Sequence, residues 1–398
     1  MNKNAYSDLP LSDALAQLEA CTSQPFECAQ PIPPALNHAQ SFLAHEHDVI
    51  FSKEWICIGR EDEIPNPGDY LTHEVAGVSV LIVREKKEIL RAFVNACAHR
   101  FACLVPGNEE DNTSSKGTAK RFTCRYHAWT YGLDGQLINA PYMKMKEGFQ
   151  LSDHGLRQLQ LSTWQGFVYV TLASETIEPP DQRLKTLTNN VVGRYDMGCY
   201  ITVLRETMIW NANWKNLIGN FTESYHVPMA HGETFAKHEK PLEEYVCGED
   251  NNHYGYHRAA QKSDTGLGAA HPKNQRLSGQ WRRMMVDFCV FPNHLVTLMP
   301  DYLWYISVQP KGTDQMIATW GVAIPPEVFD DIPKAGYEQW VSEFKHYMDI
   351  ANEEDKELVE ALHIGTRSPL LPTGTYHPLE KNLWQFTKYL SRMCRGSP

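Results

Sequence analysis

The sequence has no excess of positive charge: its 398 residues include 37 Lys and Arg against 48 Asp and Glu, a formal net charge of −11. This balance is the wrong sign for a protein that binds nucleic acid or anionic lipid through a basic surface. No apolar run is long enough to span a membrane, and the N-terminal stretch lacks the apolar core of a signal peptide, so we expect a cytoplasmic protein. No G-x-G-x-x-G fingerprint follows a predicted strand, which excludes the usual dinucleotide-binding motif.

A disulfide framework is also missing. The 10 cysteines are spread over a chain much longer than a disulfide-stapled mini-domain, and they form no plant-type ferredoxin run. Hydrophobic residues make up 42% and charged residues 21% of the chain. This composition is ordinary for a globular protein, and the length allows two or three domains.

Two short motifs each combine a thiol with an imidazole: Cys97-Ala-His99 and Cys124-Arg-Tyr-His127. Two Cys and two His suit either tetrahedral zinc or a Rieske [2Fe-2S] cluster, in which two His replace two Cys on one iron. Structural zinc fingers usually pair Cys with Cys and His with His, whereas here each loop supplies one of each. The spacing therefore favours the Rieske cluster, with zinc as the alternative.

A second group of residues of metal-ligand type lies near the end of a predicted helix that begins near Asn213. Pro228 should end this helix, which places His226 on its last turn and His231 just beyond it. Glu223 precedes His226 by three residues, and Asn220 by six. Two imidazoles need one carboxylate to complete the facial triad of non-haem Fe(II) oxygenases. The helix is predicted from apolar residues at helical spacing, namely Leu217, Phe221 and Tyr225.

The missing carboxylate is predicted on a later helix, from Gln339 to Ile364. Asp355 should share its inward face with Leu358, Val359 and Leu362. A buried acid is costly unless it is paired or bound to metal, so we select Asp355 as the third ligand. Glu354 borders the same face and is the second choice. Without the His pair, an ordinary solvated acidic turn over residues 353–355 would be the better interpretation.

These motifs together resemble the oxygenase (alpha) subunit of Rieske-type ring-hydroxylating and demethylating non-haem iron oxygenases, across nearly the whole chain. The resemblance rests on both cluster loops, on Asn-Trp-Lys (213–215) with Glu-x-x-His-x-x-x-x-His (223–231), and on Glu354-Asp355. It implies an α+β fold with a small antiparallel Rieske domain and a catalytic domain whose antiparallel sheet is flanked by helices. We place the Rieske domain at 42–171, with Trp164 to Val170 as its clearest strand, and the catalytic domain at 172–398. Residues 1–41 are expected to be an extension that packs on the catalytic domain.

The resemblance also implies two cofactors and a reaction. A Rieske [2Fe-2S] cluster and a mononuclear Fe(II) would serve a terminal oxygenase that receives electrons from a separate NAD(P)H-dependent reductase, with or without a ferredoxin. The cluster ligands would be Cys97, His99, Cys124 and His127, and the iron ligands His226, His231 and Asp355. Glu223 would bridge His127 of one subunit and His226 of the next in a homo-oligomer, usually a trimer, with Asn220 beside it in the catalytic site.

The substrate stays open between an aromatic acid, as in aromatic hydrocarbon catabolism, and a methylammonium compound that is oxidatively demethylated. Many aromatic dihydroxylating members have Asp where this chain has Glu223, which favours monooxygenation or demethylation. Residues 288–291 and 303–306 are candidates for the pocket wall. A Rieske electron carrier without oxygenase activity is the alternative. The polar segment 107–118 is longer than in the family and is expected to be a solvated loop.

Overall fold

The computed structural model describes residues 6–87, 89–107, 115–232, 234–235, 245–263, 265–371 and 374–396. The chain forms two compact units, a smaller one from Phe51 to Pro180 and a larger one that combines Met1–Ile50 with Asp181–Pro398. Both boundaries lie later in the chain than the expected positions near residues 42 and 171. The predicted α+β class is confirmed, and none of the 10 cysteines, which all lie within the described residues, forms a disulfide. Within the described residues, no helix is long and apolar enough to cross a membrane.

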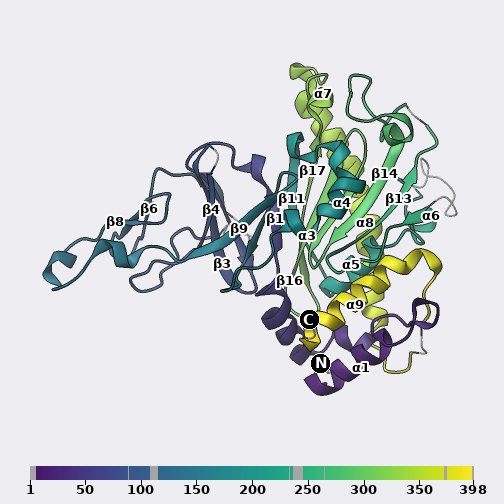
Figure 1. The fold of residues 1–398 in the computed structure, drawn as a ribbon, viewed down its shortest axis with the longest axis horizontal. Helices are drawn as coiled ribbons and strands as arrows, with labels where there is room; N and C mark the ends of the chain where they lie inside the picture. Colours follow the sequence, from purple (N-terminus) through teal and green to yellow (C-terminus); the bar gives the residue numbers. More distant parts are fainter. Residues whose placement is uncertain are drawn as a thin grey trace. The chain divides into compact units, whose positions relative to one another are not determined.

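The smaller unit is built from antiparallel strands (Figure 1). Its larger sheet has seven strands in the order β1-β10-β9-β4-β3-β2-β5, and a three-stranded sheet has the order β6-β7-β8. Cys97 and Cys124 belong to its hydrophobic core, together with Phe93 and Trp129. The strands are β1 (Ile56–Arg60), β2 (Asp69–Val75), β3 (Val78–Lys86), β4 (Ile89–Val94), β5 (Lys116–Thr118), β6 (Phe122–Thr123), β7 (Thr130–Tyr131), β8 (Leu137–Asn139), β9 (Gln158–Trp164) and β10 (Phe167–Thr171).

The segment from Trp164 to Val170 is a hairpin, so the prediction of one continuous strand was wrong. Strand β9 ends at Trp164 and β10 begins at Phe167, and the two residues pair with each other. Gln165 and Gly166 between them both have positive φ, 51° and 80°. A two-residue turn of this kind matches the right-handed twist of the strands it joins. The uninterrupted apolar pattern hid the turn because Gln is not a usual turn residue.

The polar segment 107–118 is only partly described, since residues 108–114 lie outside the described residues. Lys116–Thr118 form strand β5, where a solvated loop was expected, and Gly117 pairs with Tyr70 of β2. A Cβ atom on Gly117 would lie 2.7 Å from the Tyr70 hydroxyl oxygen. The glycine therefore allows this edge strand to pass close to the Tyr70 ring.

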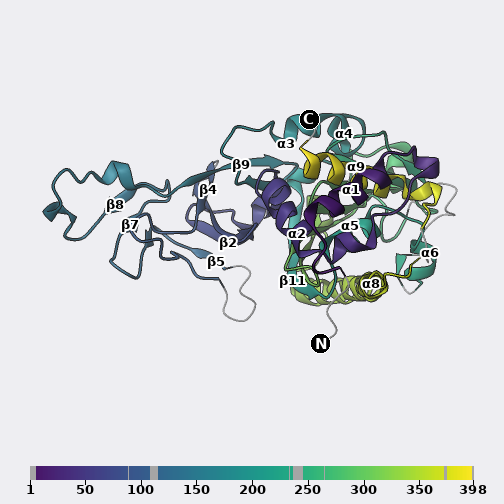
Figure 2. The same ribbon diagram turned by 90° about the horizontal axis from the view of Figure 1, so that it is seen from below.

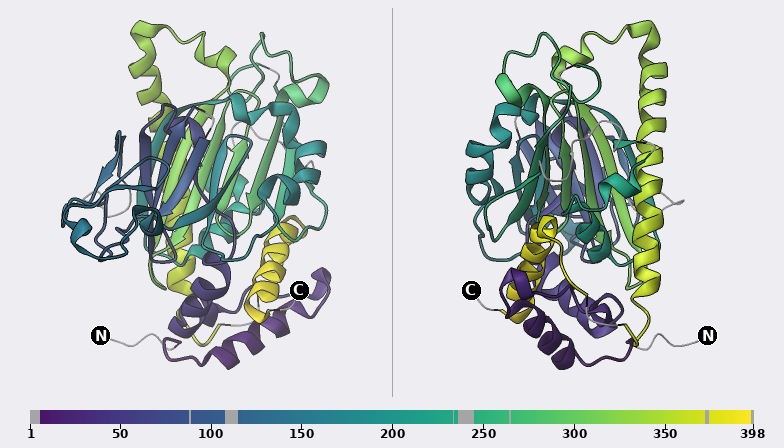
Figure 3. Two further views of the ribbon diagram at one scale, coloured as in Figure 1. Left: turned by 60° about the vertical axis from the view of Figure 1, so that its left-hand side comes forward. Right: turned by 90° about the vertical axis from the view of Figure 1, so that its right-hand side faces the viewer.

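The larger unit is organised around an antiparallel sheet of seven strands in the order β11-β17-β16-β15-β14-β13-β12. Helices α5, α8 and α9 lie against this sheet (Figure 3), and α1 packs on α9 (Figure 2). The strands are β11 (Ile201–Trp210), β12 (Val246–Cys247), β13 (Tyr254–Ala260), β14 (Met284–Val290), β15 (His294–Leu298), β16 (Leu303–Pro310) and β17 (Met316–Ile324). The helices are α1 (Leu11–Thr22), α2 (Gln40–Glu46), α3 (Pro180–Arg183, at the boundary), α4 (Lys185–Asn190), α5 (Trp214–Phe221), α6 (Val227–Ala230), α7 (Pro326–Phe329), α8 (Tyr337–Gly365) and α9 (Lys381–Arg395).

Helix α8 buries Asp355, as expected, but with different neighbours. Leu358 and Leu362 are 39% and 52% exposed, so their predicted place on the inward face was wrong. Val359 is buried, as predicted. The inward face also carries polar residues that a search for apolar periodicity misses. Its buried members are Met348, Ala351, Asn352, Asp355, Val359 and His363.

Candidate active site

The two Cys-His motifs of the smaller unit fold into the same turn. The N–H of Phe101 donates to the carbonyl of Cys97 at 2.9 Å, and the N–H of Ala128 donates to that of Cys124 at 3.0 Å. Phe101 and Ala128 also share a positive φ, 63° and 57°. Both thiols are buried at the start of their turns.

The two imidazoles of these motifs lie side by side. The ring centroids of His99 and His127 are 4.7 Å apart, and His99 stacks on Trp129 at 4.6 Å. His127 is exposed, so this imidazole can be reached from outside the unit. Two buried thiols and two adjacent imidazoles are the donor set that a Rieske cluster needs.

Tyr131 is a residue to which the sequence analysis assigned no role. Its hydroxyl accepts a hydrogen bond from the N–H of Ala98 at 3.0 Å and lies 3.1 Å from Sγ of Cys97. Burial raises the pKa of Tyr131 well above its usual value, so the hydroxyl stays protonated and donates to the sulfur. Hydrogen bonds to cluster sulfurs tune reduction potential.

Helix α5 is fixed at its start by the residues of the Asn-Trp-Lys motif. The side chain of Asn213 caps the helix by accepting from the N–H of Lys215 at 3.1 Å. The ammonium group of Lys215 is fully buried and lies 2.9 Å from Oε1 of Glu46 on α2. The indole of Trp214 donates to the same carboxylate at 3.2 Å. These contacts hold the element that leads to the candidate iron ligands.

The helix ends earlier than predicted. It stops at Phe221, and His226 is the N-cap of a separate short helix, α6. Pro228 lies in the first turn of α6, where the missing N–H costs no hydrogen bond, so it begins a helix instead of ending one. The irregular segment between the helices carries Glu223 and leads to His226. Asn220 is on the last turn of α5, and it lines a pocket together with Glu223 and His226.

The structure brings His226, His231 and Asp355 together, with ligand atoms within 4.8 Å of one another. Nε2 of His226 is 3.6 Å and Nε2 of His231 is 3.2 Å from Oδ1 of Asp355. Nδ1 of His226 lies 2.6 Å from Oε1 of Glu223, and a carboxylate can only accept, so Nδ1 carries the proton there. The two Nε2 lone pairs and a buried oxygen of Asp355 that has no hydrogen-bond partner therefore converge on one point. A divalent cation fits this donor set.

The electrostatics of the three side chains favour a positive charge between them. Burial raises the pKa of Asp355, but the close imidazoles of His226 and His231 outweigh it and hold the pKa well below its usual range. Burial lowers the pKa of His226, but the carboxylates of Asp355 and Glu223 outweigh it and raise the pKa to about 10.

Glu354, the second-choice ligand, has a different position. Its Oε2 lies 2.9 Å from Nδ1 of His231 and 2.5 Å from the hydroxyl of Thr234, and it is not one of the three converging ligand atoms. The carboxylate therefore fixes the orientation and tautomer of the His231 ring, as such partners do around metal sites. Adjacent acids on a helix point in different directions, and only the fold shows that Glu354 contacts Nδ1 of His231 whereas Asp355 faces Nε2.

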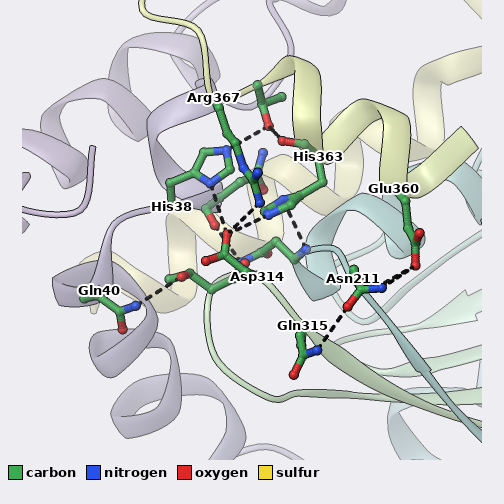
Figure 4. A network of polar contacts seen from close by, with 12 residues as sticks. His38, Gln40, Asn211, Asp314, Gln315, Glu360, His363 and Arg367 are labelled. Carbon is green, nitrogen blue, oxygen red and sulfur yellow. Dashed lines mark hydrogen bonds and ion pairs between the residues drawn. The ribbon is translucent and has the colours of Figure 1, made fainter. Parts of the chain in front are cut away.

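A second group of metal-type side chains, His38, Asp314 and His363, also lies within 4.8 Å (Figure 4). The N–H of Asn213 donates to Nδ1 of His363 at 3.3 Å, so the proton of this ring is on Nε2 and points at Asp314, 2.9 Å away. Nε2 of His38 lies 2.9 Å from the hydroxyl of Thr366. Each of the two imidazoles thus has a hydrogen-bond partner outside the group, and the group joins the start of α5 to the end of α8.

The pocket beside the candidate iron ligands has a floor made by the sheet. Strand residues Met285, Asp287, Thr297 and Trp304 line it. The expected wall segment 303–306 thus contributes Trp304, whereas residues 288–291 are outside the lining. The lining also includes the polar residues His257 and Asp287, which the sequence motifs do not mark. The residues around them have the mostly apolar pattern of strands in a hydrophobic core.

Comparison with known proteins agrees with this arrangement. Residues 194–396 match the family model of the ring hydroxylating alpha subunit (catalytic domain), and residues 54–159 match that of the Rieske [2Fe-2S] domain. The carnitine monooxygenase oxygenase subunit of Escherichia coli (strain K12) is 28% identical over 86% of this chain and 87% of that protein. The glycine betaine monooxygenase oxygenase subunit of Chromohalobacter salexigens is 33% identical over 58% of this chain and 51% of that protein. A solved quaternary ammonium Rieske monooxygenase, 22% identical, covers 98% of both chains with a TM-score of 0.76, which shows the shared fold.

The chain belongs to the ring-hydroxylating alpha subunits, the oxygenase components of Rieske non-haem iron oxygenases. Its cofactors are a Rieske [2Fe-2S] cluster and a mononuclear iron, and it uses dioxygen with electrons from a separate reductase. The zinc alternative is set aside by the match to the Rieske domain. The electron-carrier alternative is set aside because the catalytic-domain match covers the region that carries the His pair.

Proposed function

We propose that this protein oxidises a methylammonium compound, a small substrate such as carnitine or glycine betaine, by monooxygenation or demethylation. The observation that carries the proposal is the charge of the pocket: among the described residues that line it, the ionisable ones are acids and histidines, and none is Lys or Arg. A pocket lined in this way favours a cationic group such as a trimethylammonium, which an aromatic acid lacks. The names of the two sequence relatives support the same substrate class.

The proposal assigns the metal sites to the residues selected above. The cluster would be held by Cys97, His99, Cys124 and His127, and the iron by His226, His231 and Asp355. When bound, the iron activates dioxygen and the cluster supplies electrons to it. Glu223 and Glu354 orient the two imidazoles by accepting hydrogen bonds from their Nδ1–H groups.

The proposed route for electrons crosses between subunits of a homo-oligomer, with a trimer as the expected state. His127 of one subunit would reach Glu223 of the next, whose Oε1 already accepts from His226. The exposure of His127 supports this route. Glu223→Gln should keep both metals but slow electron transfer in a single turnover. Transfer at the rate of the unaltered protein would contradict the bridge.

The substrate class is tested with the purified protein and a competent reductase. Oxygen uptake and formaldehyde release are followed over a panel of trimethylammonium compounds and aromatic acids. His226→Ala should retain the visible and EPR spectra of the cluster and lose all product, whereas His346→Ala, at an exposed histidine of α8, should behave as the wild type. Product from aromatic acids alone would refute the substrate proposal, and turnover by His226→Ala would refute the iron site.

A further inference from the structure

One carboxylate in the pocket is not accounted for by the two metal sites. Asp287 lies on β14, and its side chain is 12% exposed. His257 on β13 and Thr297 on β15 are its partners in the antiparallel register, and all three line the pocket. They form one polar row across the floor, and Trp304 on β16 continues it beyond Thr297.

The row holds Asp287 without neutralising it by a fixed positive charge. The Thr297 hydroxyl donates to Oδ1 at 2.6 Å. Nε2 of His257 lies 3.1 Å from Oδ2. The row contains no Lys or Arg, so no permanently charged cation stands against the carboxylate. A buried carboxylate kept in this way favours a cationic group in the cavity.

Aromatic rings lie close to the same row. The centroid of Trp304 is 5.9 Å from that of Phe221 and 6.1 Å from that of Phe235, and all three line the pocket. Cations are attracted to the face of such rings, with Trp the strongest. Trp304 and Asp287 are two strands apart, about 10 Å, so one group between them can face both.

The hydrogen bonds of Asp287 also indicate the kind of cation. Oδ1 already accepts a hydrogen bond from Thr297 and Oδ2 already faces the His257 ring, so a primary ammonium would find little room to donate to either oxygen. A quaternary ammonium has no N–H and needs only negative charge and apolar or aromatic surface. The row offers this combination.

We propose that Asp287, held by His257 and Thr297, is the counter-ion of a quaternary ammonium group of the substrate, with Trp304 as the aromatic side of the same subsite. This inference rests on the proposed function and adds the residue that selects positive charge. A neutral analogue of equal shape, with carbon in place of nitrogen, gains nothing from Asp287.

The test compares KM values of the holoenzyme for a trimethylammonium substrate and its neutral 3,3-dimethylbutyl analogue. In Asp287→Asn, KM for the cation should rise at least tenfold, about 1.4 kcal/mol, and KM for the neutral analogue should change less than twofold. Asp287→Glu keeps the charge and should keep the preference. Asp301→Asn is the matched control, since it removes a carboxylate outside the lining of this pocket and should leave the ratio unchanged.

Binding of tetramethylammonium, measured by calorimetry on holoenzyme with verified iron content, gives a second readout. Its Kd should rise about tenfold in Asp287→Asn. An equal rise in both KM values would indicate a structural role and overturn the inference, as would an unchanged Kd or no binding to the wild type. If the wild type oxidises aromatic acids and no trimethylammonium compound, the proposed function fails, and the tetramethylammonium measurement still decides the subsite.

Discussion

The position of Glu354 leads to a prediction that separates an orienting carboxylate from an iron ligand. Its Oε2 accepts from Nδ1 of His231 at 2.9 Å and from Thr234 at 2.5 Å. In Glu354→Gln the amide oxygen can still accept, but a charge-assisted hydrogen bond becomes a neutral one. The difference is about 1–1.5 kcal/mol, which corresponds to a Kd for Fe(II) about 10-fold higher. Glu354→Ala leaves both donors unsatisfied and should cost about 100-fold.

The assay is a titration of Fe(II) into protein from which the mononuclear iron has been removed with a chelator, with the Rieske spectrum as the check that the cluster is intact. Asp355→Asn should bind no measurable iron, because it loses a charged ligand. Glu353→Gln is the matched control, since this acid is on the same turn and its side chain is 53% exposed. If Glu354→Gln abolishes iron binding as Asp355→Asn does, Glu354 is a ligand and the reasoning is refuted. An unchanged Kd would equally refute the orienting role.

Three further predictions concern the scaffold. Lys215→Met leaves the buried Glu46 carboxylate without its cationic partner and should lower the free energy of unfolding by about 3–5 kcal/mol. The double variant with Glu46→Leu should recover most of this loss in thermal unfolding, and a double variant no more stable than the single one would contradict the prediction. Burial lowers the pKa of His38 to about 4, so the stability that neutral His38 contributes is present above about pH 6.5 and is lost as the pH falls towards 4. His38→Gln should reduce the loss of unfolding free energy over this pH range by about 3 kcal/mol, and an unchanged pH profile of stability would refute this. Tyr131→Phe removes a hydrogen bond to Sγ of Cys97 and should lower the reduction potential of the cluster by about 20–60 mV in an EPR-monitored titration, whereas a rise would contradict the assignment.

Local patterns carried much of the prediction of the fold. The helix predicted from Gln339 to Ile364 is α8, because its apolar residues keep helical spacing. The Cys-His motifs bring their donors close together within single turns. Errors arose where two local signals compete. Pro228 can end a helix or begin one, and its neighbours in the sequence do not show which. The packing of α5 ends that helix at Phe221, and Pro228 then begins α6. The Gln165-Gly166 turn was missed because apolar residues on both sides also suit one long strand.

The sequence by itself determined the class of the protein, because the spacing of its cysteine, histidine and acid residues is a local property. This spacing can be recognised without knowing how distant parts of the chain pack. Only the tertiary structure decided what the neighbouring acids do. Glu354 and Asp355 are adjacent in the chain, yet the rotation of α8 points one at the far side of His231 and the other at the shared point between two imidazoles. The polar row around Asp287 likewise depends on the register of strands that are distant in sequence. Register and helix rotation are set by long-range packing, which local spacing does not encode.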